Sequence, residues 1–402
     1  MVLTKEQRHL LKKWVRLNRK AYNMAIEYLN QHQGFDRTGI GGTGKQAFKT
    51  FFKVQIRPDW LKKELPAAIL DQAVMEAYSA WSKTKKNPKY VGKGKNKKPS
   101  PKAGLKIARF RSIRDKSQTL QFKVASDLKQ GKLLPQYWGD LGAFECSDNG
   151  KRFCVINPNY TPEVTYKNGN FYLSLPQDTE VEDNGKESFI AFDPGVRTFL
   201  TGFDGNQFIE FGEGDINRIV RLCRSLDKMQ SQRDLLKGHK NRHLRYQLNQ
   251  KMKRKRRKIR NLVDEMHRKT ASWLAKNYRV IALPTYESSQ MVCKAKRKIQ
   301  SKTARSMLTW AMYRFSQVLE CQCAKHGSIL TRHTEEYTSK TCPHCGHIHQ
   351  KLGGRKQFIC PNCGFSLKRD FVGALGNFLK ALWDSTVLSE VRSDCFTFTI
   401  NV

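Results

Sequence analysis

The sequence predicts an α/β protein whose carboxyl-terminal half is built on one mixed sheet, and three observations predict it. Three short apolar strands follow one another between Ser188 and Phe211, with turns at Pro194-Gly195 and Asp204-Gly205. From Ile216 onward, helical and strand patterns alternate and end in a helix. Acidic residues fall at the ends of several of these elements. Three antiparallel strands followed by helix, strand, helix, strand and helix are the element order of the RNase H-like fold.

The amino-terminal segment has the pattern of an amphipathic helix. Its apolar residues recur at three- and four-residue intervals, and they are Leu10, Leu11, Trp14, Val15, Leu17, Tyr22, Ala25, Ile26 and Leu29. Lys and Arg occupy the other face, for which plain solvation is the alternative to phosphate binding. A second helix is expected over about 67–83.

Residues 83–106 form a basic stretch punctuated by Gly and Pro, which suits a loop lying along phosphates. Short strand-like runs follow at 119–124, 132–134, 164–166 and 171–175, with turn residues between them. These runs predict a small β domain over about 105–180. The acidic stretch 177–186 is interpreted as a linker.

The carboxyl-terminal elements are bounded by their apolar patterns and by turn residues. Strands are expected over 188–193, 198–203, 207–211, 278–283 and 328–331. Helical stretches are expected over about 216–276, 303–323 and 371–383.

Three acidic residues are candidates for one metal site. Asp193 ends the first strand of this half, Glu287 lies just past the fourth, and Asp370 begins the final helix. In the RNase H-like fold these positions converge, and three carboxylates can hold two Mg²⁺ ions roughly 4 Å apart for phosphodiester hydrolysis. The competing interpretations are a turn cap for Asp193 and a solvated loop acid for Glu287.

Four cysteines have the spacing of a zinc ribbon. Cys342 and Cys345 form one CxxCG knuckle, and Cys360 and Cys363 form a second. Four thiolates close a tetrahedral Zn²⁺ site, so one structural zinc ion is expected. Three nearby histidines are then surplus surface residues, and they are His344, His347 and His349. Two further cysteines are expected to be buried thiols, and they are Cys321 and Cys323.

The charge balance points to a polyanionic partner. Lys and Arg number 74 against 35 Asp and Glu, a formal net charge of +39. Nucleic acid is the first candidate and an anionic membrane surface the second. The sequence has no apolar run of about 18 residues, and its start lacks a signal-peptide pattern, so no membrane association is expected. We therefore expect a soluble, intracellular protein whose cysteines do not form a disulfide framework.

A basic cluster lies in the long helical stretch between the first two acidic motifs. Its residues include Lys253, Arg254, Arg256 and Arg257. Contact with a nucleic-acid duplex is the favoured interpretation, because the whole chain is strongly basic. A nuclear localisation signal and a solvated face are the alternatives.

Several motifs together resemble the TnpB family of transposon-encoded, RNA-guided nucleases, which is ancestral to type V CRISPR effectors. The motifs are Asp193-Pro194-Gly195, Tyr337–Gly346 and Arg369-Asp370. The stretch Leu283–Met291 is most similar to the branch shared with eukaryotic Fanzor proteins. Looser similarity at Tyr22-Asn23 and Arg109-Phe110-Arg111 extends the resemblance over nearly the whole chain.

The resemblance implies a domain organisation. Residues 1–185 would be a wedge β-barrel carrying a helical recognition insertion over roughly 5–100. Residues 186–335 would be the first part of a RuvC-like nuclease domain, residues 336–367 an inserted zinc ribbon, and residues 368–402 the final RuvC helix and tail.

The resemblance also implies an activity. Asp193, Glu287 and Asp370 would be the catalytic, Mg²⁺-binding residues, with Mn²⁺ as a substitute metal. The protein would bind one transposon-derived guide RNA, with Arg109 and Arg111 among the nucleic-acid contacts. It would recognise a short motif beside its target and cleave double-stranded DNA, in the nucleoid or cytoplasm of a bacterium or in a eukaryotic nucleus.

Two positions depart from the family pattern. Val372 stands where an Asn usually follows the last acid, and Lys368 stands where an acidic residue is frequent. The three acids are present, so an intact site is expected, while the metal affinity and rate are left open.

Three other functions are compatible with parts of the sequence. A strand-transferring transposase would use the same metal site, and a guided DNA-binding regulator would bind without cleaving. A zinc-dependent RNA chaperone leaves the three placed acids unexplained.

Overall fold

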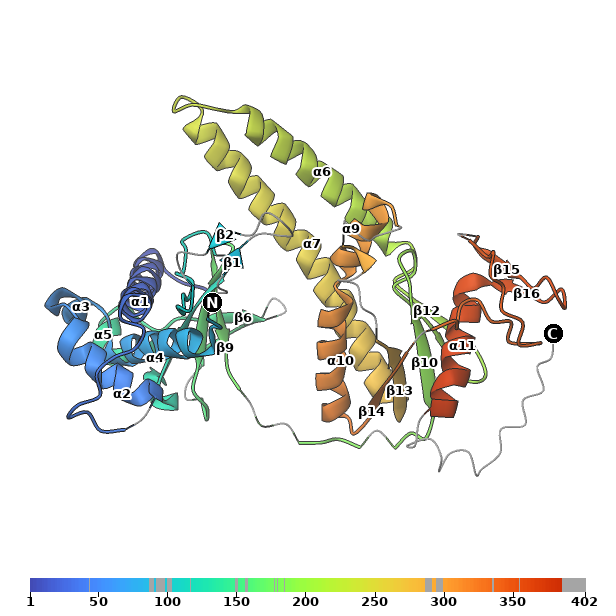
Figure 1. Ribbon diagram of the computed structural model, residues 1–402, viewed down its shortest axis with the longest axis horizontal. Helices are drawn as coiled ribbons and strands as arrows, with labels where there is room; N and C mark the ends of the chain where they lie inside the picture. Colours follow the sequence, from blue (N-terminus) through green and yellow to red (C-terminus); the bar gives the residue numbers. More distant parts are fainter. Residues whose placement is uncertain are drawn as a thin grey trace. The chain divides into compact units, whose positions relative to one another are not determined.

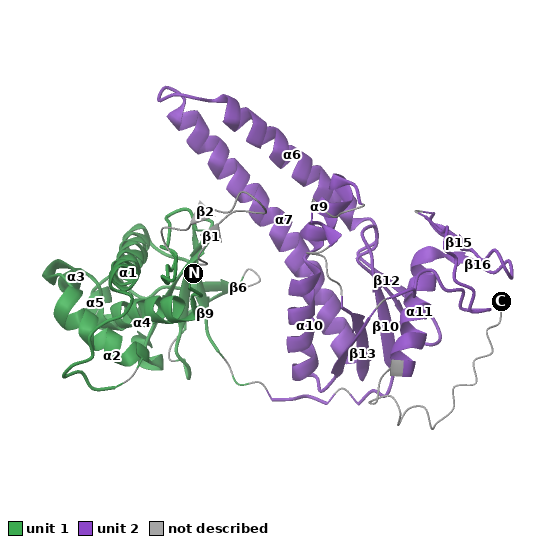
Figure 2. Ribbon diagram, in the orientation of Figure 1, with its two compact units in different colours: residues 1–178 green, residues 179–402 purple. Residues whose placement is uncertain are grey.

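The computed structural model describes residues 1–42, 44–86, 90–91, 98–99, 103–115, 117–148, 151–155, 158–176, 178, 180–183, 185–285, 291–293, 299–334, 336–353 and 355–384. The chain divides into two compact units, residues 1–178 and 179–402 (Figure 2). The division falls within the stretch interpreted above as a linker, seven residues before the expected domain start at 186.

Unit 1 begins with a group of helices that pack on one another. They are α1 (Lys5–His32), α2 (Gly44–Phe51), a π-helical turn (Phe52–Ile56), α3 (Asp59–Glu64) and α4 (Ala67–Lys83) (Figure 1). Helix α1 starts with a capping box, because the side chains of Thr4 and Gln7 each accept a hydrogen bond from the other residue's backbone N–H. Its apolar face, which includes Leu11 and Trp14, is buried as the periodicity predicted.

The strands of unit 1 are short. They are β1 (Tyr90–Val91), β2 (Lys98–Pro99), β3 (Ser117–Gln121), β4 (Leu128–Lys129), β5 (Lys132–Leu133), β6 (Cys146–Asp148), β7 (Lys151–Phe153), β8 (Glu163–Lys167) and β9 (Asn170–Ser174), with a 3₁₀ turn (Ala125–Asp127) and the short helix α5 (Pro135–Trp138). In the described part of unit 1, β3, β8 and β9 form one sheet and the others pair only as two-stranded ribbons. The wedge barrel remains a prediction.

Polar side chains of α1 hold the extended segment 106–111 by its backbone. Asn23 donates to Arg111 O (2.9 Å) and accepts from Arg111 N (2.8 Å). Asn30 makes the same pair of bonds with Ala108 (3.0 and 2.8 Å). Gln33 makes a third pair with Lys106 (3.1 and 2.8 Å). These three pairs satisfy backbone groups that would otherwise need a neighbouring strand.

Unit 2 is built on a mixed sheet with the expected strand arrangement. Its strands are β10 (Phe189–Pro194), β11 (Leu200–Phe203), β12 (Phe208–Phe211), β13 (Val280–Pro284) and β14 (Ile329–His333). Among the described residues the order is β12-β11-β10-β13-β14. β10 is antiparallel to β11 and parallel to β13, and β13 is parallel to β14. This is the topology that the RNase H-like element order predicted.

Helices cover both faces of this sheet (Figure 1). The described helices of unit 2 are α6 (Asp215–Leu235), α7 (Arg242–Asn277), α9 (Ser301–Trp310), α10 (Met312–Lys325) and α11 (Arg369–Asp384), of which α10 and α11 lie on opposite faces of the sheet. Side chains of β10 alternate between the faces. Ile190 and Phe192 pack in the cluster that contains α7 and α10 residues, whereas Phe189 and Ala191 pack with Phe378 of α11. The next residue on the α11 face is Asp193.

Two expected helices are each divided in the structure. The stretch 216–276 forms an α6–α7 hairpin, which turns after Leu235 where Gly238 adopts φ +79°. The stretch 303–323 is broken at Ala311, which has φ 50° and ψ 54°. The prediction for Cys321 is wrong and that for Cys323 is confirmed, because Cys321 lies on the exposed face of α10 and Cys323 on the buried face. No helix in the described residues is long and apolar enough to cross a membrane.

Candidate active site and metal centre

Asp193 stands where β10 ends, on the sheet face covered by α11. In the β10–β11 ladder it lies opposite Thr201. The chain then turns tightly, because a Cβ added at Gly195 would lie 2.5 Å from Thr198 O. The Gly195 N–H donates to Phe199 O at 3.2 Å, which closes this turn. A strand end followed by a fixed turn gives Asp193 a defined position.

Helix α11 approaches this carboxylate closely because it has glycines on its inner face. A Cβ added at Gly373 would lie 2.7 Å from Asp193 Cγ and closer still to Oδ2. A Cβ at Gly376 would lie 2.6 Å from Thr338 O. One turn after Gly373, the buried Asn377 side-chain amide donates to Phe192 O at 3.0 Å. Helix α11 is thereby docked on β10, with Asp370 in its first turn.

Gly373→Ala should separate activity from stability. The added methyl group must displace the Asp193 carboxylate, since no other atom is as close to it. Ala stabilises a helix interior by about 0.5–1 kcal/mol relative to Gly, so the thermal midpoint should not fall much. We expect the rate of the reaction at this cleft to fall by about 100-fold, the cost of a misplaced reacting group. Gly41→Ala, where a Cβ meets nothing within 4 Å, is the control; equal activity of both variants would contradict the prediction.

Asp193 and Asp370 line one cleft in unit 2, with a volume of about 850 Å³. Its cationic residues come from the β10–β11 turn, from the ribbon and from the start of α11, and they are Arg197, Arg355, Lys356, Lys368 and Arg369. Lys368 is paired with Glu210 (2.5 Å), which fixes its position beside Phe371. Carboxylates surrounded by cations suit a substrate with phosphate groups.

The third predicted acid, Glu287, lies outside the described residues. The strand that precedes it is placed, because β13 runs parallel to β10 and pairs Ala282 with Ala191. Continuing that register brings the end of β13, at Pro284, level with Asp193. The chain therefore leaves β13 at the same sheet edge as the cleft.

The described residues fit a divalent cation. Asp193 and Asp370 supply hard oxygen ligands to one open cleft, and Gly373 leaves the space beside Asp193 that a side chain would fill. Mg²⁺ is usually held by one or two carboxylates, with water and substrate oxygens completing its shell. Both residues remain proposed rather than assigned ligands.

The four predicted zinc ligands are brought together. The sulfur atoms of Cys342, Cys345, Cys360 and Cys363 all lie within 4.8 Å of one another. The Cys342–Cys363 and Cys345–Cys360 sulfur pairs are each 3.6 Å apart. A tetrahedral ion with Zn–S bonds of about 2.3 Å requires sulfurs about 3.8 Å apart. None of the three nearby histidines belongs to this group within the described residues.

The two knuckles have matching local geometry. Gly346 donates to Cys342 O (2.9 Å) with φ +71°, a conformation that favours glycine. Gly364 does the same with Cys360 O (3.0 Å). The Asn362 side-chain amide donates to Cys345 Sγ (3.5 Å) and, with the His347 backbone, lowers the pKa of this thiol to about 6. Strands β15 (Gln357–Ile359) and β16 (Ser366–Lys368) complete the ribbon.

Val372 belongs to the ribbon interface and not to the cleft. It is fully buried and packs with Cys342, Leu352, Phe358 and Cys360. The apolar residue at this position is therefore explained by packing of α11 against the ribbon.

Val372→Asn should destabilise the protein, although it restores the residue usual in the family. An amide in this apolar cluster loses its water without gaining a partner, at a cost of about 2–4 kcal/mol including the lost packing. The thermal midpoint should fall by several degrees. Leu379→Asn, on an exposed position of the same helix, should change it little. A higher midpoint or a rise in activity for Val372→Asn would contradict the packing explanation.

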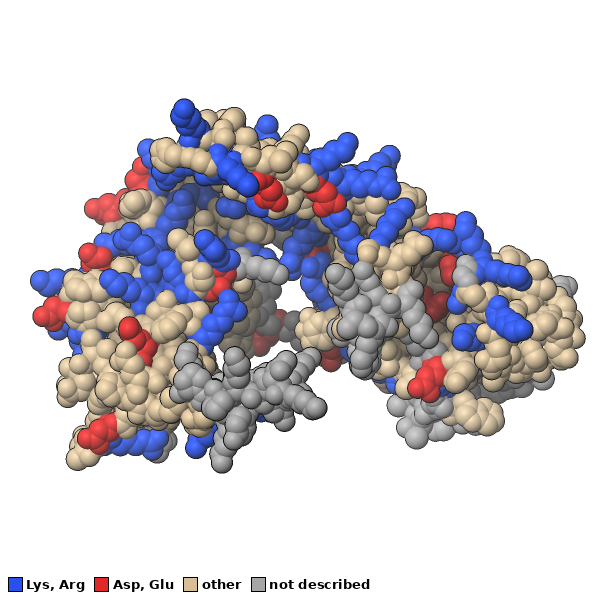
Figure 3. Space-filling model, turned by 45° about the horizontal axis from the view of Figure 1, so that its top comes forward, with Lys and Arg blue, Asp and Glu red and all other residues tan. Residues whose placement is uncertain are grey.

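The predicted nucleic-acid contacts differ in their surroundings. Arg111 is engaged inside unit 1, since its guanidinium lies 3.9 Å from the Tyr22 ring centroid and pairs with Glu76 (2.6 Å). The Arg109 side chain is 88% exposed and lies 3.7 Å from Asp115. On α7, Lys253, Arg254 and Arg256 are exposed and Arg257 is half-buried. Lys and Arg side chains spread along the α6–α7 hairpin (Figure 3).

Several cleft residues were not singled out from the sequence. They are Arg197, Glu213, Asn217, Thr303, Thr338, Ser339, Arg355, Lys356 and Arg369. Thr338 and Ser339 belong to the Tyr337–Gly346 motif. The motif marks these two residues in the sequence, but it does not indicate that they line the cleft. Arg369 likewise lies in the Arg369-Asp370 motif, and the others lie in loops and at helix ends, where neither periodicity nor motif spacing marks them.

The chain is similar in sequence to known proteins along most of its length. The family model described as "Cas12f1-like, TNB domain" matches residues 313–376, which span α10, β14, the ribbon and the start of α11. Two TnpB-like proteins of Acanthamoeba polyphaga mimivirus are each 26% identical to the chain, over 393 and 396 residues. Each match covers 94% of this chain and 71% of the relative.

The chain is similar to TnpB-like proteins over nearly its whole length. Solved structures with lower similarity include the Cas12f1–sgRNA–target DNA complex, with 17% identity and a TM-score of 0.33 over 93% of this chain and 95% of that one. CasPhi-2 (Cas12j) bound to crRNA has 9% identity and a TM-score of 0.36, over 94% and 96%. The similarity to TnpB-like proteins is given by the sequence matches and not by these scores.

Proposed function

We propose that this protein is an RNA-guided, metal-dependent endonuclease that cleaves double-stranded DNA by phosphodiester hydrolysis at one RuvC-type site. The observation that carries the proposal is the single cleft that contains Asp193 and Asp370 among five cationic residues. In this proposal Glu287 is the third acid. A transposon-derived guide RNA and a short motif beside the target would direct the cut.

Each group of cleft residues has a defined task. Asp193 and Asp370, with Glu287 as the proposed third acid, would hold two Mg²⁺ ions or Mn²⁺, and these ions would supply an activated water and charge stabilisation of the leaving oxygen. Arg197, Arg355 and Lys356 attract the phosphates on either side of the scissile bond. The tight turn at Gly195 and the docked helix α11 fix the distance between the two described acids.

The charge distribution supports a nucleic-acid partner. The chain carries a formal charge of +39, and the α6–α7 hairpin presents exposed Lys253, Arg254 and Arg256. Such residues bind backbone phosphates without contacting specific bases, which suits a protein whose specificity comes from base pairing. The zinc ribbon holds the start of α11, so its zinc ion has a structural role.

Sequencing of the RNA that copurifies with the protein from its native locus tests the proposal. One discrete RNA with a constant part and a locus-derived end is expected. A plasmid carrying the matching sequence beside randomised flanks should then be cut in the presence of Mg²⁺, and the cut molecules report the flanking motif. Heterogeneous RNA with no guided cutting would contradict it. Joined DNA ends would favour a transposase, and guided binding without cutting would favour a regulator.

A further inference from the structure

One aromatic residue connects the turn after Asp193 to the long helix α7. Trp310 is the last residue of α9 and is 2% exposed. Its indole Nε1–H donates to Val196 O at 3.0 Å. Val196 lies in the turn between β10 and β11, three residues after Asp193. The indole thus holds the backbone of the segment that positions the acid.

The other end of Trp310 is held by α7. Its backbone carbonyl lies 2.8 Å from His267 Nε2, and His267 is fully buried. Burial lowers the pKa of His267 to about 4, so the ring is neutral at physiological pH and its Nε2 carries the donated proton. The left-handed backbone of Ala311, which ends α9, leaves the Trp310 carbonyl outside the regular bonding of α10.

The ring of Phe199 completes the connection. Phe199 ends the same turn, and its ring lies 5.2 Å from both the His267 and the Trp310 rings. Its backbone N–H donates to Phe211 O at 2.9 Å, which ties the turn to β12. The turn is therefore fixed at Val196 by a hydrogen bond and at Phe199 by ring packing.

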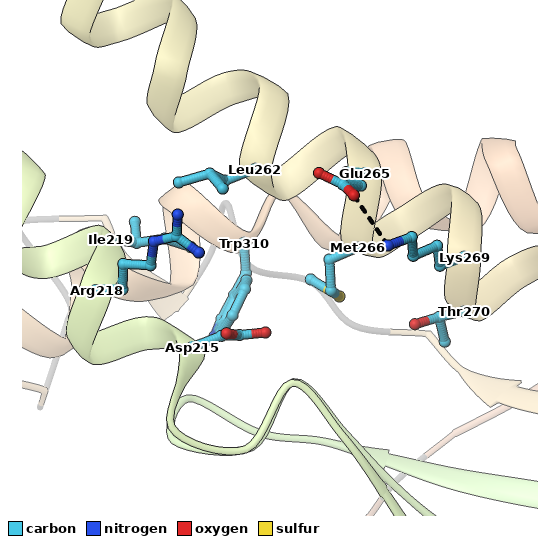
Figure 4. A pocket seen from close by; sticks show the side chains of 9 residues that line it. All are labelled: Asp215, Arg218, Ile219, Leu262, Glu265, Met266, Lys269, Thr270 and Trp310. Atoms are coloured by element: carbon cyan, nitrogen blue, oxygen red, sulfur yellow. Dashed lines mark ion pairs between the residues drawn. The ribbon is translucent and has the colours of Figure 1, made fainter. Parts of the chain in front are cut away.

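Packing on the far side of Trp310 is incomplete. A cavity of about 260 Å³ lies between α6 and α7 and against this ring, lined by Asp215, Ile219, Met266 and Thr270 among others (Figure 4). Close packing normally fixes a buried ring from all sides. Because a cavity lies on one side of the ring, the position of Trp310 depends more on its hydrogen bonds to Val196 and His267.

We propose that Trp310 is a positioning residue, which holds the turn after Asp193 against α7 so that the carboxylate keeps its place in the cleft. This inference rests on the proposed function for its catalytic consequence only. Its structural consequence is independent, because the turn should loosen without the indole donor whatever reaction the cleft performs. Since α7 belongs to the basic hairpin, the position of Asp193 then depends on the placement of that hairpin.

Trp310→Phe tests the inference, because it keeps a ring beside Phe199 and removes only the donor. Trp60→Phe is the matched control, since Trp60 is 38% exposed on α3 of unit 1. Hydrogen exchange of the turn amides, at Gly195 and Phe199, should be at least about fivefold faster in Trp310→Phe alone. Single-turnover cleavage of saturating target DNA should fall by about 10- to 100-fold, with the DNA affinity unchanged.

A second pair of variants separates positioning from general destabilisation. His267→Gln keeps a side-chain N–H for the Trp310 carbonyl, whereas His267→Leu does not. We expect the turn to exchange at nearly the wild-type rate in His267→Gln and faster in His267→Leu. Equal exchange of the turn in Trp310→Phe and wild type would overturn the inference. Absence of guided cleavage by the wild type would contradict the proposed function and leave the exchange result to decide on Trp310.

Discussion

Asp193→Asn is expected to abolish DNA cleavage while guide RNA and target binding persist. The substitution preserves the shape of the side chain and removes the charge that draws a divalent cation into the cleft. Metal ions contribute several kcal/mol of transition-state stabilisation in such sites, which corresponds to at least about 1,000-fold in rate. Single-turnover cleavage of a guided target and a parallel gel-shift titration measure the two properties separately.

Asp234→Asn is the matched control for this loss. Asp234 lies exposed on α6 in the same unit and pairs only with Arg233 and Gln230 beside it. Its replacement should leave cleavage within about twofold of wild type. Cleavage by Asp193→Asn at a comparable rate would show that the reaction takes place elsewhere, and loss of binding together with cleavage would show a structural role instead.

Cys360→Ser is expected to have the second largest effect, because it opens the zinc site. Structural Zn²⁺ contributes roughly 10–16 kcal/mol to the folding of small zinc domains at neutral pH. The ribbon cluster includes Val372 of α11, and Thr338 lies against Gly376 of the same helix. Loss of the ribbon should therefore release the start of α11 and displace Asp370. We expect bound zinc to fall below one per chain, and cleavage to be lost.

Zinc content measured by mass spectrometry, together with thermal melting before and after chelation, checks this expectation. Cys321→Ser is the control, since this thiol is exposed on α10 and outside the four-cysteine group. It should retain zinc and its thermal midpoint. Full cleavage by a zinc-free Cys360→Ser protein would show that α11 is docked without the ribbon.

The strands of unit 2 were predictable because each is a short apolar run bounded by turn residues. The four zinc ligands were predictable because their chemistry requires a fixed local spacing. Asp193 and Asp370 were placed by the ends of predicted elements, and the cleft brings them together. Glu287 remains a prediction.

Other features depend on contacts that local sequence does not encode. The helix breaks at Ala311, where the sequence has neither Gly nor Pro. The break accompanies the burial of Trp310 before it and of Phe315 after it. The role of Val372 follows from a ribbon that folds back onto α11. Arg111 has the composition of a phosphate contact, yet Tyr22 and Glu76 occupy its guanidinium.

The way α1 holds the segment 106–111 has an evolutionary consequence. The six hydrogen bonds from Asn23, Asn30 and Gln33 all reach main-chain atoms. The exposed side chains of the held segment, Arg109 and Phe110, are therefore free to diverge, while the three amide-bearing positions are not. Lineages of this family can thus acquire new outward-facing chemistry on that segment by single substitutions, with its backbone course kept unchanged.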